Sequence, residues 1–450
     1  MPQISAVLIV KNEAPRLAPC LAALRDVVDE IIVADTGSTD NTLEIARDFT
    51  PLCHEIPWEN DFAAARNRAL SFASGPWILS IDADEIVQEP AKARALLQAF
   101  MQGQPAGATG TIRHRSPTGT GAEQTIVTGS LERFFEKSAY QFSGIVHEQL
   151  APRNGVRGPV VPTGVVVLHS GYEYRREDPD HKGRRNLPLL ERAAAANPDD
   201  AYYRYQIGRT LFTLKRYPEA IAAFEEALRG IDFQGGAPAY RNGVPAGRET
   251  LTTLLTSLAY ALANTGRLRD AENLLTDHIA LDHHGTHWAD FYHACGYVAL
   301  MLGDLERAKV AYTESMRCGP IREDVAGTGS YTSAYHLGLL AEAESDLPGA
   351  IGHYATSLQF QPDYRVTLDR YVDFMVEHQF GVAPNIQAHA DPEAFHAAVL
   401  RRLKARLDVN DKTGADFLIT TIGLLGFTNK RFAGDLLEQC QKLRMPYGLG

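Results

Sequence analysis

Residues 30–42 have the sequence EIIVADTGSTDNT, in which an apolar run ends in Asp35 and a polar turn follows it. A near-continuous apolar run is typical of a parallel strand that helices cover on both faces. Gly37 permits a close backbone approach, and the Ser, Thr and Asp residues after it are typical caps of a following helix. We therefore predict a strand over residues 30–34 and a helix over residues 41–49.

The same alternation extends to both sides of this stretch. Apolar runs predict strands over residues 4–10, 53–56 and 77–81, and helical periodicity predicts helices over residues 17–28 and 62–73. Repeated strand–helix units imply right-handed crossovers and a three-layer α/β domain. In such sheets ligands bind beyond the carboxyl ends of the strands. We therefore expect the binding and catalytic residues just after each strand.

The chain changes character after about residue 182, where helices rich in Ala, Leu, Tyr and Glu follow one another. A small residue precedes an alanine by twelve positions in four successive copies. This spacing resembles the tetratricopeptide pattern of about 34 residues, in which small residues let two helices approach closely. The copies are Gly208, Ala220 and Phe224; Ala259, Ala271 and Leu275; Gly296, Ala308 and Tyr312; and Gly338, Ala350 and Tyr354.

The predicted fold class is therefore α/β plus all-α. We expect a Rossmann-like domain with a mostly parallel sheet over residues 1–180 and four helix hairpins over residues 186–363. Residues 364–450 stay helical but lose the repeat, which predicts a terminal cap or an oligomerisation element. Surplus Gly-rich segments at residues 230–249 and 319–329 predict loops, which in a solenoid collect on one face.

Composition and charge argue against several classes of protein. The 450 residues carry a net charge of -11, which argues against a general nucleic-acid binder. The five cysteines are far apart and form no C-x-x-C pair, as in a protein with reduced thiols. No apolar run approaches the roughly 18 residues that cross a bilayer, and no signal peptide is recognisable, so we expect a soluble cytoplasmic protein.

Polar residues at the predicted strand ends are the candidates for chemistry. Phosphate-loop, dinucleotide-binding, zinc-protease and serine-hydrolase signatures are absent. Asn12 and Glu13 follow the first strand, and Asp82 and Asp84 follow the strand at residues 77–81. Two carboxylates at i and i+2 there can hold a hard cation such as Mg²⁺ or Mn²⁺, although any strand-to-loop transition can show this pattern.

Seven stretches together resemble an inverting glycosyltransferase of family 2 with the GT-A fold, over about residues 1–180. They are VLIVKNE, VDEIIVADTGSTDNT, WENDFAAARNRAL, SIDADE, LERFF, GIVHEQL and VLHSGY. The members that the chain most resembles carry a helical repeat tail. They include S-glycosyltransferases that modify bacteriocin peptides and relatives of lipopolysaccharide-core glucosyltransferases.

This resemblance implies a role for each matching residue. Asp82 would meet the ribose or the metal, and Asp84 and His169 would bind the metal. Glu148 would be the catalytic base, with His147 as competitor and Glu132 as a lesser rival. The remaining donor-site residues are Val10, Asn12, Glu13, Asp35 and Gly37 around the nucleoside, and Asp61, Arg66 and Asn67 against the base and diphosphate. Structural roles stay open: a surface arginine for Arg66, a salt bridge for Glu148 and a structural histidine for His169.

The implied function is transfer of a sugar from a nucleoside-diphosphate sugar, with UDP-glucose as the first guess and Mn²⁺ or Mg²⁺ as cofactor. The acceptor would be a peptide, a protein or a cell-envelope glycan, and the tail would present it or form a homodimer. One alternative is a tetratricopeptide scaffold with an inactive transferase domain. Another is contact with a membrane surface through residues 417–427. His283, His284 and His287 suggest a polar loop rather than a metal site.

Overall fold

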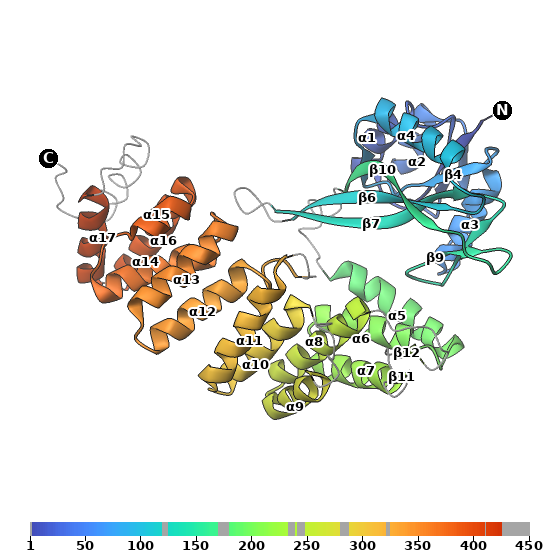
Figure 1. Cartoon of the computed structure of the whole chain (residues 1–450). Coiled ribbons are helices and arrows are strands. Elements are labelled where there is room, and N and C mark those ends of the chain that lie inside the picture. The colour runs from blue at the N-terminus through green and yellow to red at the C-terminus, as the bar shows by residue number, and fades with distance from the viewer. Residues whose placement is uncertain are drawn as a thin grey trace. The chain divides into compact units, whose positions relative to one another are not determined.

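A computed structural model describes most of the chain and divides it into two compact units, Met1–Arg216 and Tyr217–Gly450 (Figure 1). The described residues are 2–118, 125–169, 180–232, 239–240, 248–279, 288–320, 325–409 and 411–424. Outside them lie residues 425–450 of the predicted helical segment, with the end of residues 417–427, and parts of the two predicted loops. His283, His284 and His287 also lie outside the described residues. Each unit is described by itself.

The first unit is built on an eight-stranded sheet with the order β3-β2-β1-β4-β7-β6-β10-β5. Strands β1, β2, β3 and β4 run parallel to one another, and β7 then joins β4 in the antiparallel direction. The strands are β1 (Ile4–Val10), β2 (Glu30–Asp35), β3 (Cys53–Glu55), β4 (Trp77–Ser80), β5 (Glu85–Val87), β6 (Thr109–Thr118), β7 (Thr125–Glu136) and β10 (Val160–His169). The four strands predicted from apolar runs are confirmed, and the sheet is of the expected mostly parallel, GT-A-like kind.

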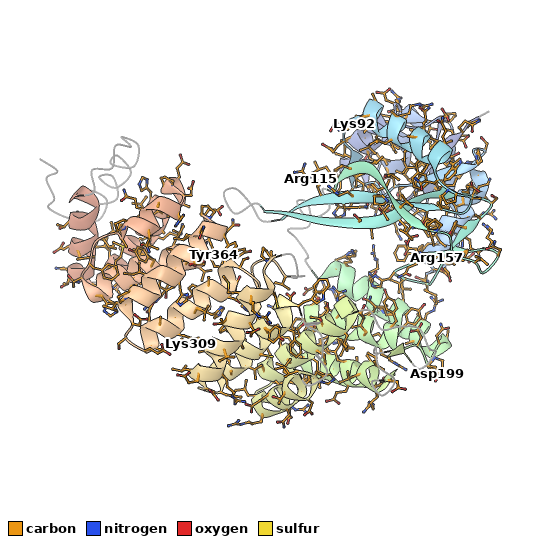
Figure 2. All side chains as sticks on the ribbon, in the orientation of Figure 1. Lys92, Arg115, Arg157, Asp199, Lys309 and Tyr364 are labelled. Carbon is orange, nitrogen blue, oxygen red and sulfur yellow. The ribbon has the colours of Figure 1, made fainter. Side chains whose placement is uncertain are left out.

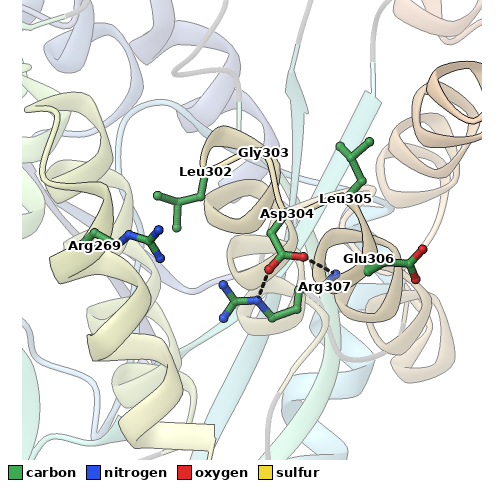
Figure 3. Close-up of a pocket in the computed structure, with 7 residues that line it drawn as sticks. All are labelled: Arg269, Leu302, Gly303, Asp304, Leu305, Glu306 and Arg307. Atoms are coloured by element: carbon green, nitrogen blue, oxygen red, sulfur yellow. Dashed lines mark hydrogen bonds and ion pairs between the residues drawn. The ribbon is translucent and has the colours of Figure 1, made fainter.

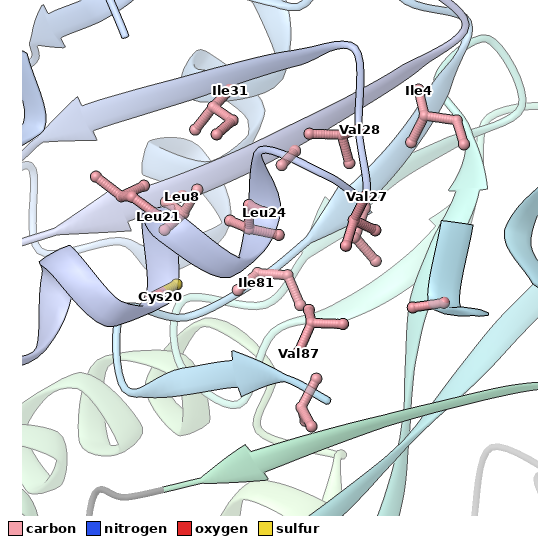
Figure 4. Packing of buried hydrophobic residues seen from close by; sticks show 14 of the residues in the cluster. Ile4, Leu8, Cys20, Leu21, Leu24, Val27, Val28, Ile31, Ile81 and Val87 are labelled. Carbon is pink, nitrogen blue, oxygen red and sulfur yellow. The ribbon is translucent and has the colours of Figure 1, made fainter. Parts of the chain in front are cut away.

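Helices cover both faces of this sheet, because the side chains of β1 alternate between two apolar clusters. Ile4 and Leu8 pack with helices α1 (Ala14–Leu24), α2 (Thr42–Phe49) and α4 (Pro90–Gly103), as Figure 4 shows for α1. Val7 faces the other way, towards α3 (Phe62–Phe72) and the hairpin of β8 (Tyr140–Ser143) and β9 (Gln149–Pro152). The predicted three-layer arrangement is confirmed.

Two further helices belong to the first unit, α5 (His181–Ala196) and α6 (Ala201–Thr213). The Arg185 guanidinium lies 5.2 Å from the centre of the Phe62 ring, and Arg192 Nη1 donates to the carbonyl of Asn60 over 3.2 Å. These contacts hold α5 against the start of α3. The unit boundary falls at residue 216, whereas the sequence predicts domain boundaries at residues 180 and 363, which stay predictions.

In the second unit, helices pair as the repeat predicts for its second, third and fourth copies. Each anchor alanine, Ala220, Ala271, Ala308 and Ala350, is fully buried. Gly296 lies against the Tyr312 ring, where an added Cβ would stand 2.8 Å from a ring carbon. The second unit begins with α7 (Tyr217–Arg229). The pairs that follow are α8 (Arg248–Asn264) with α9 (Leu268–Ile279), α10 (Ala289–Met301) with α11 (Leu305–Cys318), and α12 (Tyr331–Ala343) with α13 (Leu347–Phe360).

A small two-stranded ribbon of β11 (Ile231–Asp232) and β12 (Ala239–Tyr240) lies within the segment predicted as the first loop. The chain continues with α14 (Arg365–His378), α15 (Pro384–His389), α16 (Pro392–Asp408) and α17 (Lys412–Leu424). One apolar cluster runs from Ala341 to Ile419 and joins these helices to α13. The choice between a terminal cap and an oligomerisation element stays a prediction. Among the described residues, no helix is long and apolar enough to span a membrane.

Candidate active site

The parallel strands β1, β2 and β4 end at one edge of the sheet, where the turn after β2 is tightly held. Asp35 is buried, and its Oδ1 accepts the backbone N–H groups of Gly37 and Ser38, each over 2.7 Å. Gly37 has a φ of +106°, which a residue with a side chain rarely adopts. The sequence predicts both residues at a nucleoside pocket, and the structure shows that together they fix the shape of this turn.

The turn after β1 is bonded to the turn after β2. Asn12 Oδ1 accepts from the backbone N–H of Thr39 over 2.7 Å, and the Asn12 N–H donates to Ser38 Oγ over 2.9 Å. The Glu13 N–H donates to Thr42 Oγ1 over 2.8 Å. These bonds tie the two turns after Val10 and Asp35 into one polar wall.

Asp82, just after β4, is held by two arginines. Its Oδ1 accepts from Arg66 Nη2 and its Oδ2 from Arg133 Nη2, each over 2.8 Å. Burial by itself would raise the pKa of the Asp82 carboxyl, but the charges of Arg133 and Arg66 outweigh burial and hold this pKa far below its usual range. Asp82 is therefore ionised, and both of its oxygens are engaged by guanidinium groups.

A buried pair lies behind Asp82. Glu85 Oε2 accepts the backbone N–H of Asp82 over 3.0 Å, and Glu85 Oε1 lies 3.2 Å from His114 Nδ1. Burial and the neighbouring Asp82 charge raise the pKa of Glu85 to about 7. Burial and the charge of Arg133 lower the pKa of His114 to about 4, so this imidazole is neutral and its Nδ1–H can donate to Glu85. Glu85 belongs to the quoted SIDADE stretch, but neither Glu85 nor His114 was predicted as a site residue.

Asp84 pairs with the last residue of β10. Asp84 Oδ2 lies 3.3 Å from His169 Nε2 and 3.9 Å from Arg16 Nη1. Burial opposes ionisation of Asp84, but the bond from His169 outweighs it and lowers the Asp84 pKa, while the same bond raises the pKa of His169. The prediction that these two residues, far apart in the chain, come together is therefore consistent with the geometry.

Asp84 offers a carboxylate oxygen and His169 an imidazole nitrogen, and both are common ligands of Mn²⁺. They converge closely enough to share an ion, so the residues present fit a divalent metal that also takes phosphate oxygens. Within the described ranges, no group of three or more His, Cys, Asp and Glu side chains could hold a metal by itself. Asp82, the third predicted ligand, is bound to arginines here.

Glu148 lies at the far end of the same arginine. Arg66 Nε donates to Glu148 Oε1 over 2.6 Å, and the Arg66 side chain is only 8% exposed. Next to Glu148, His147 has a φ of +55°. His147 is exposed, but its pKa is lowered. The larger cause is partial removal of its imidazole from water, and the next is the charge of Lys182 on α5. Of the two predicted base candidates, Glu148 is thus joined to Asp82 through Arg66, and His147 is its neighbour in the chain.

Asp61 and Asn67 make local structural contacts. Asp61 is the N-cap of α3, with its Oδ1 accepting from the Ala64 N–H over 2.8 Å. The Asn67 amide donates to and accepts from the backbone of Phe142, both over 2.8 Å, and so fastens α3 to β8. The predicted contacts of Asp61 and Asn67 with a nucleotide stay predictions.

Arg16 links the polar wall to Asp84. Its Nη1 lies 3.2 Å from Glu13 Oε2, on the polar wall, and 3.9 Å from Asp84 Oδ2, on the carboxylate side. Glu132, the lesser rival as base, lies on β7 and pairs with Arg157, which is labelled in Figure 2. The strand-end residues therefore form one connected cluster, and Glu132 pairs elsewhere.

The second unit has a shallow concavity of about 420 Å³ at the turn between α10 and α11 (Figure 3). Asp304 accepts from the backbone N–H of Arg307 over 3.1 Å and from its Nε over 2.6 Å. These bonds cap α11, so the concavity belongs to the repeat architecture. Its lining is Arg269, Leu302, Gly303, Asp304, Leu305, Glu306 and Arg307.

Comparison with known proteins matches both parts of the chain. Residues 5–150 match the model of glycosyl transferase family 2, and residues 201–229 match that of the tetratricopeptide repeat. A TPR repeat-containing protein of Synechococcus elongatus is 33% identical over 223 residues, which are 47% of this chain and 53% of the relative. The glycosyltransferase SunS of Bacillus subtilis is 29% identical over 236 residues, which are 50% of this chain and 53% of that protein. The chain thus spans about half the length of these relatives.

Among solved structures, glucosyl-3-phosphoglycerate synthase from Mycobacterium tuberculosis matches with a TM-score of 0.22 and 25% identity. The match covers 26% of this chain and 44% of that structure, which was determined with Mg²⁺ and uridine diphosphate.

Proposed function

Because the chain carries a glycosyl transferase family 2 domain followed by tetratricopeptide repeats, we propose that the protein is an inverting glycosyltransferase. The donor is a nucleoside-diphosphate sugar, and UDP-glucose is the first to test. The observation that carries the proposal is the connected cluster at the strand ends, in which the Asp84–His169 pair and the Arg66–Glu148 pair flank Asp82.

The donor half of the site is the polar wall together with the Asp84–His169 pair. The Asp35 turn offers a fixed backbone surface to a nucleoside, and Asn12 and Glu13 lie on the same wall. Asp84 and His169 are the residues that would hold Mn²⁺ or Mg²⁺. The chemistry that a bound divalent ion supplies is neutralisation of charge on a departing diphosphate.

The acceptor half contains Glu148. In an inverting transfer, the acceptor oxygen or sulfur attacks the anomeric carbon from the face opposite the nucleotide. A bond forms to that carbon while the bond to the diphosphate breaks, through an oxocarbenium-like transition state. Glu148 receives the acceptor proton, and the electron pair of the broken bond leaves with the diphosphate. His147 is the competing base.

The acceptor is a peptide or protein, or else a cell-envelope glycan, and the repeats present it or pair two subunits. Consecutive helical hairpins form extended surfaces of the kind that suit such a role. We also propose a cytoplasmic location, with contact at a membrane surface as the competing possibility.

A panel of nucleotide sugars tests the donor. The melting temperature of the full chain is measured with UDP-, GDP- and dTDP-sugars and Mn²⁺, since a ligand that binds the native state raises it. Release of glucose from UDP-[¹⁴C]glucose is measured alongside. If no donor stabilises the protein and none is hydrolysed or transferred, the enzyme proposal fails and the scaffold alternative takes its place.

A further inference from the structure

Arg66 joins three segments of the first unit through one buried guanidinium group. Its Nε donates to Glu148 on the β8–β9 connection, its Nη1 to Ser80 at the end of β4, and its Nη2 to Asp82. The distances are 2.6, 3.3 and 2.8 Å. Charge-assisted hydrogen bonds of this kind are strong, and removal from water makes them stronger.

The guanidinium group divides its donors between two carboxylates. Asp82 is the carboxylate that the family resemblance places at the ribose or the metal of the donor, and Glu148 belongs to the acceptor half. Asp82 has a second arginine, since Arg133 binds its other oxygen over 2.8 Å. Glu148 is only 12% exposed, and its Oε1 is bound to Arg66. A change in the position of Arg66 therefore alters the partner of Glu148 more than that of Asp82.

We propose that Arg66 is a positioning residue that couples donor binding to the state of Glu148. This inference rests on the proposed binding of a nucleoside diphosphate beside Asp82. The diphosphate brings anionic oxygens that compete with Glu148 for the Arg66 donors, since a guanidinium fork suits phosphate as well as carboxylate. As Arg66 turns to the diphosphate, Glu148 loses the hydrogen bond to Oε1, and this oxygen becomes available to the acceptor.

Coupling of this kind is reciprocal: if the diphosphate weakens the Arg66–Glu148 bond, weakening that bond must strengthen diphosphate binding. Glu148→Gln keeps an oxygen for Arg66 Nε but removes its charge. We expect UDP with Mg²⁺ to bind this variant about tenfold more tightly than the parent. A factor of about ten corresponds to the difference in strength between a charge-assisted hydrogen bond and a neutral one. Isothermal titration calorimetry on the full chain measures the change.

Loss of a nearby negative charge could also strengthen UDP binding without Arg66. A double-mutant cycle with Arg66→Lys separates the two causes, because lysine keeps the charge but has no planar fork. We expect Glu148→Gln to change UDP affinity less than about twofold in the Arg66→Lys background. An equal effect in both backgrounds overturns the proposal, as does unchanged or weaker UDP binding by Glu148→Gln.

Glu132→Gln is the matched control. Glu132 pairs with Arg157 over the same 2.6 Å but belongs to another ion pair, so its substitution should leave UDP affinity unchanged. A crystal structure of the parent with UDP and Mg²⁺ gives a second test that needs no variant. The distance from Arg66 Nε to Glu148 Oε1, 2.6 Å without ligand, should exceed the hydrogen-bonding range, and an unchanged distance overturns the proposal.

The two proposals fail in different ways. If the parent binds none of UDP, GDP and dTDP with Mg²⁺, the donor site itself is wrong, and the coupling is refuted with it. If the parent binds UDP but the cycle shows no interaction between positions 66 and 148, only the coupling is refuted.

Discussion

Replacing Gly338 by alanine tests how closely the helices of the fourth hairpin pack. A Cβ at position 338 would stand 2.5 Å from one carbon of the Tyr354 ring and 2.8 Å from another, much closer than atoms pack. Tyr354 is fully buried, and its hydroxyl donates to Glu342, so the ring cannot simply turn away. The Tyr354 ring therefore favours glycine over alanine at position 338.

The magnitude follows from two opposing terms. Forcing a methyl group into a packed core costs about 1–3 kcal/mol. Alanine regains about 1 kcal/mol because it favours the helix more than glycine does. We expect Gly338→Ala to lower the free energy of unfolding by about 0–2 kcal/mol, or the melting temperature by up to about 8 °C at 2–4 °C per kcal/mol.

Gly352→Ala in α13 is the matched control. No atom lies within 4 Å of its added Cβ, so only the helix term operates, and we expect stabilisation of up to about 1 kcal/mol. Urea unfolding of the full chain, followed by circular dichroism, compares the two variants. If Gly338→Ala stabilises the protein as much as Gly352→Ala does, the inferred packing against Tyr354 is wrong.

Three further outcomes follow from the site. Asp84→Ala should remove the stabilisation by UDP with Mn²⁺ in a melting experiment; retained stabilisation would exclude Asp84 as a ligand. Because the pKa of His169 is raised, protons compete for its nitrogen, so Mn²⁺ affinity should increase as the pH rises through 6.5 and above, and calorimetry that finds no pH dependence contradicts this assignment. The pKa of Glu85 is about 7 when folded and 4.5 ordinarily, so its contribution favours folding at low pH and diminishes between these values. The stability of the parent relative to Glu85→Gln should fall over that pH range in urea unfolding, and a constant difference would refute the shift.

Local patterns in the sequence are sufficient to predict most of the fold. Apolar runs predict the strands at residues 4–10 and 30–34, and the spacing of small residues predicts the repeat glycines. Both patterns can be read from residues that are close together in the chain. The convergence of Asp84 and His169 was predicted only through the family resemblance.

The inner part of the site could not be predicted, because it depends on pairing between distant strands. His114 on β6 and Arg133 on β7 come together with Glu85 only through the pairing of β7 with β6, of β6 with β10 and of β10 with β5. A single histidine in a strand carries no local signal. Arg133, which binds Asp82 in the structure, lies in the quoted LERFF stretch. Its place in that stretch was the one sequence signal that could have marked it as a site residue.

Asp61 shows the opposite problem. An Asp directly before a predicted helix is a visible N-cap signal. In the structure Asp61 forms this cap, because its Oδ1 accepts from the backbone N–H of Ala64. The family resemblance, by contrast, implies a ligand role for this residue. Local capping and ligand binding use the same residue types, so the sequence alone does not separate them.

The central claim is that the ends of β1, β2, β4 and β10 form one site for a nucleoside-diphosphate sugar and a divalent ion. The most direct measurement is glucose release from UDP-[¹⁴C]glucose by the full chain, with Mn²⁺ and then with excess chelator, repeated with the GDP and dTDP sugars. We predict release from at least one donor, lost with chelator and in Asp84→Ala. Release that is unaffected by both, or no release from any of the three donors, would contradict the claim.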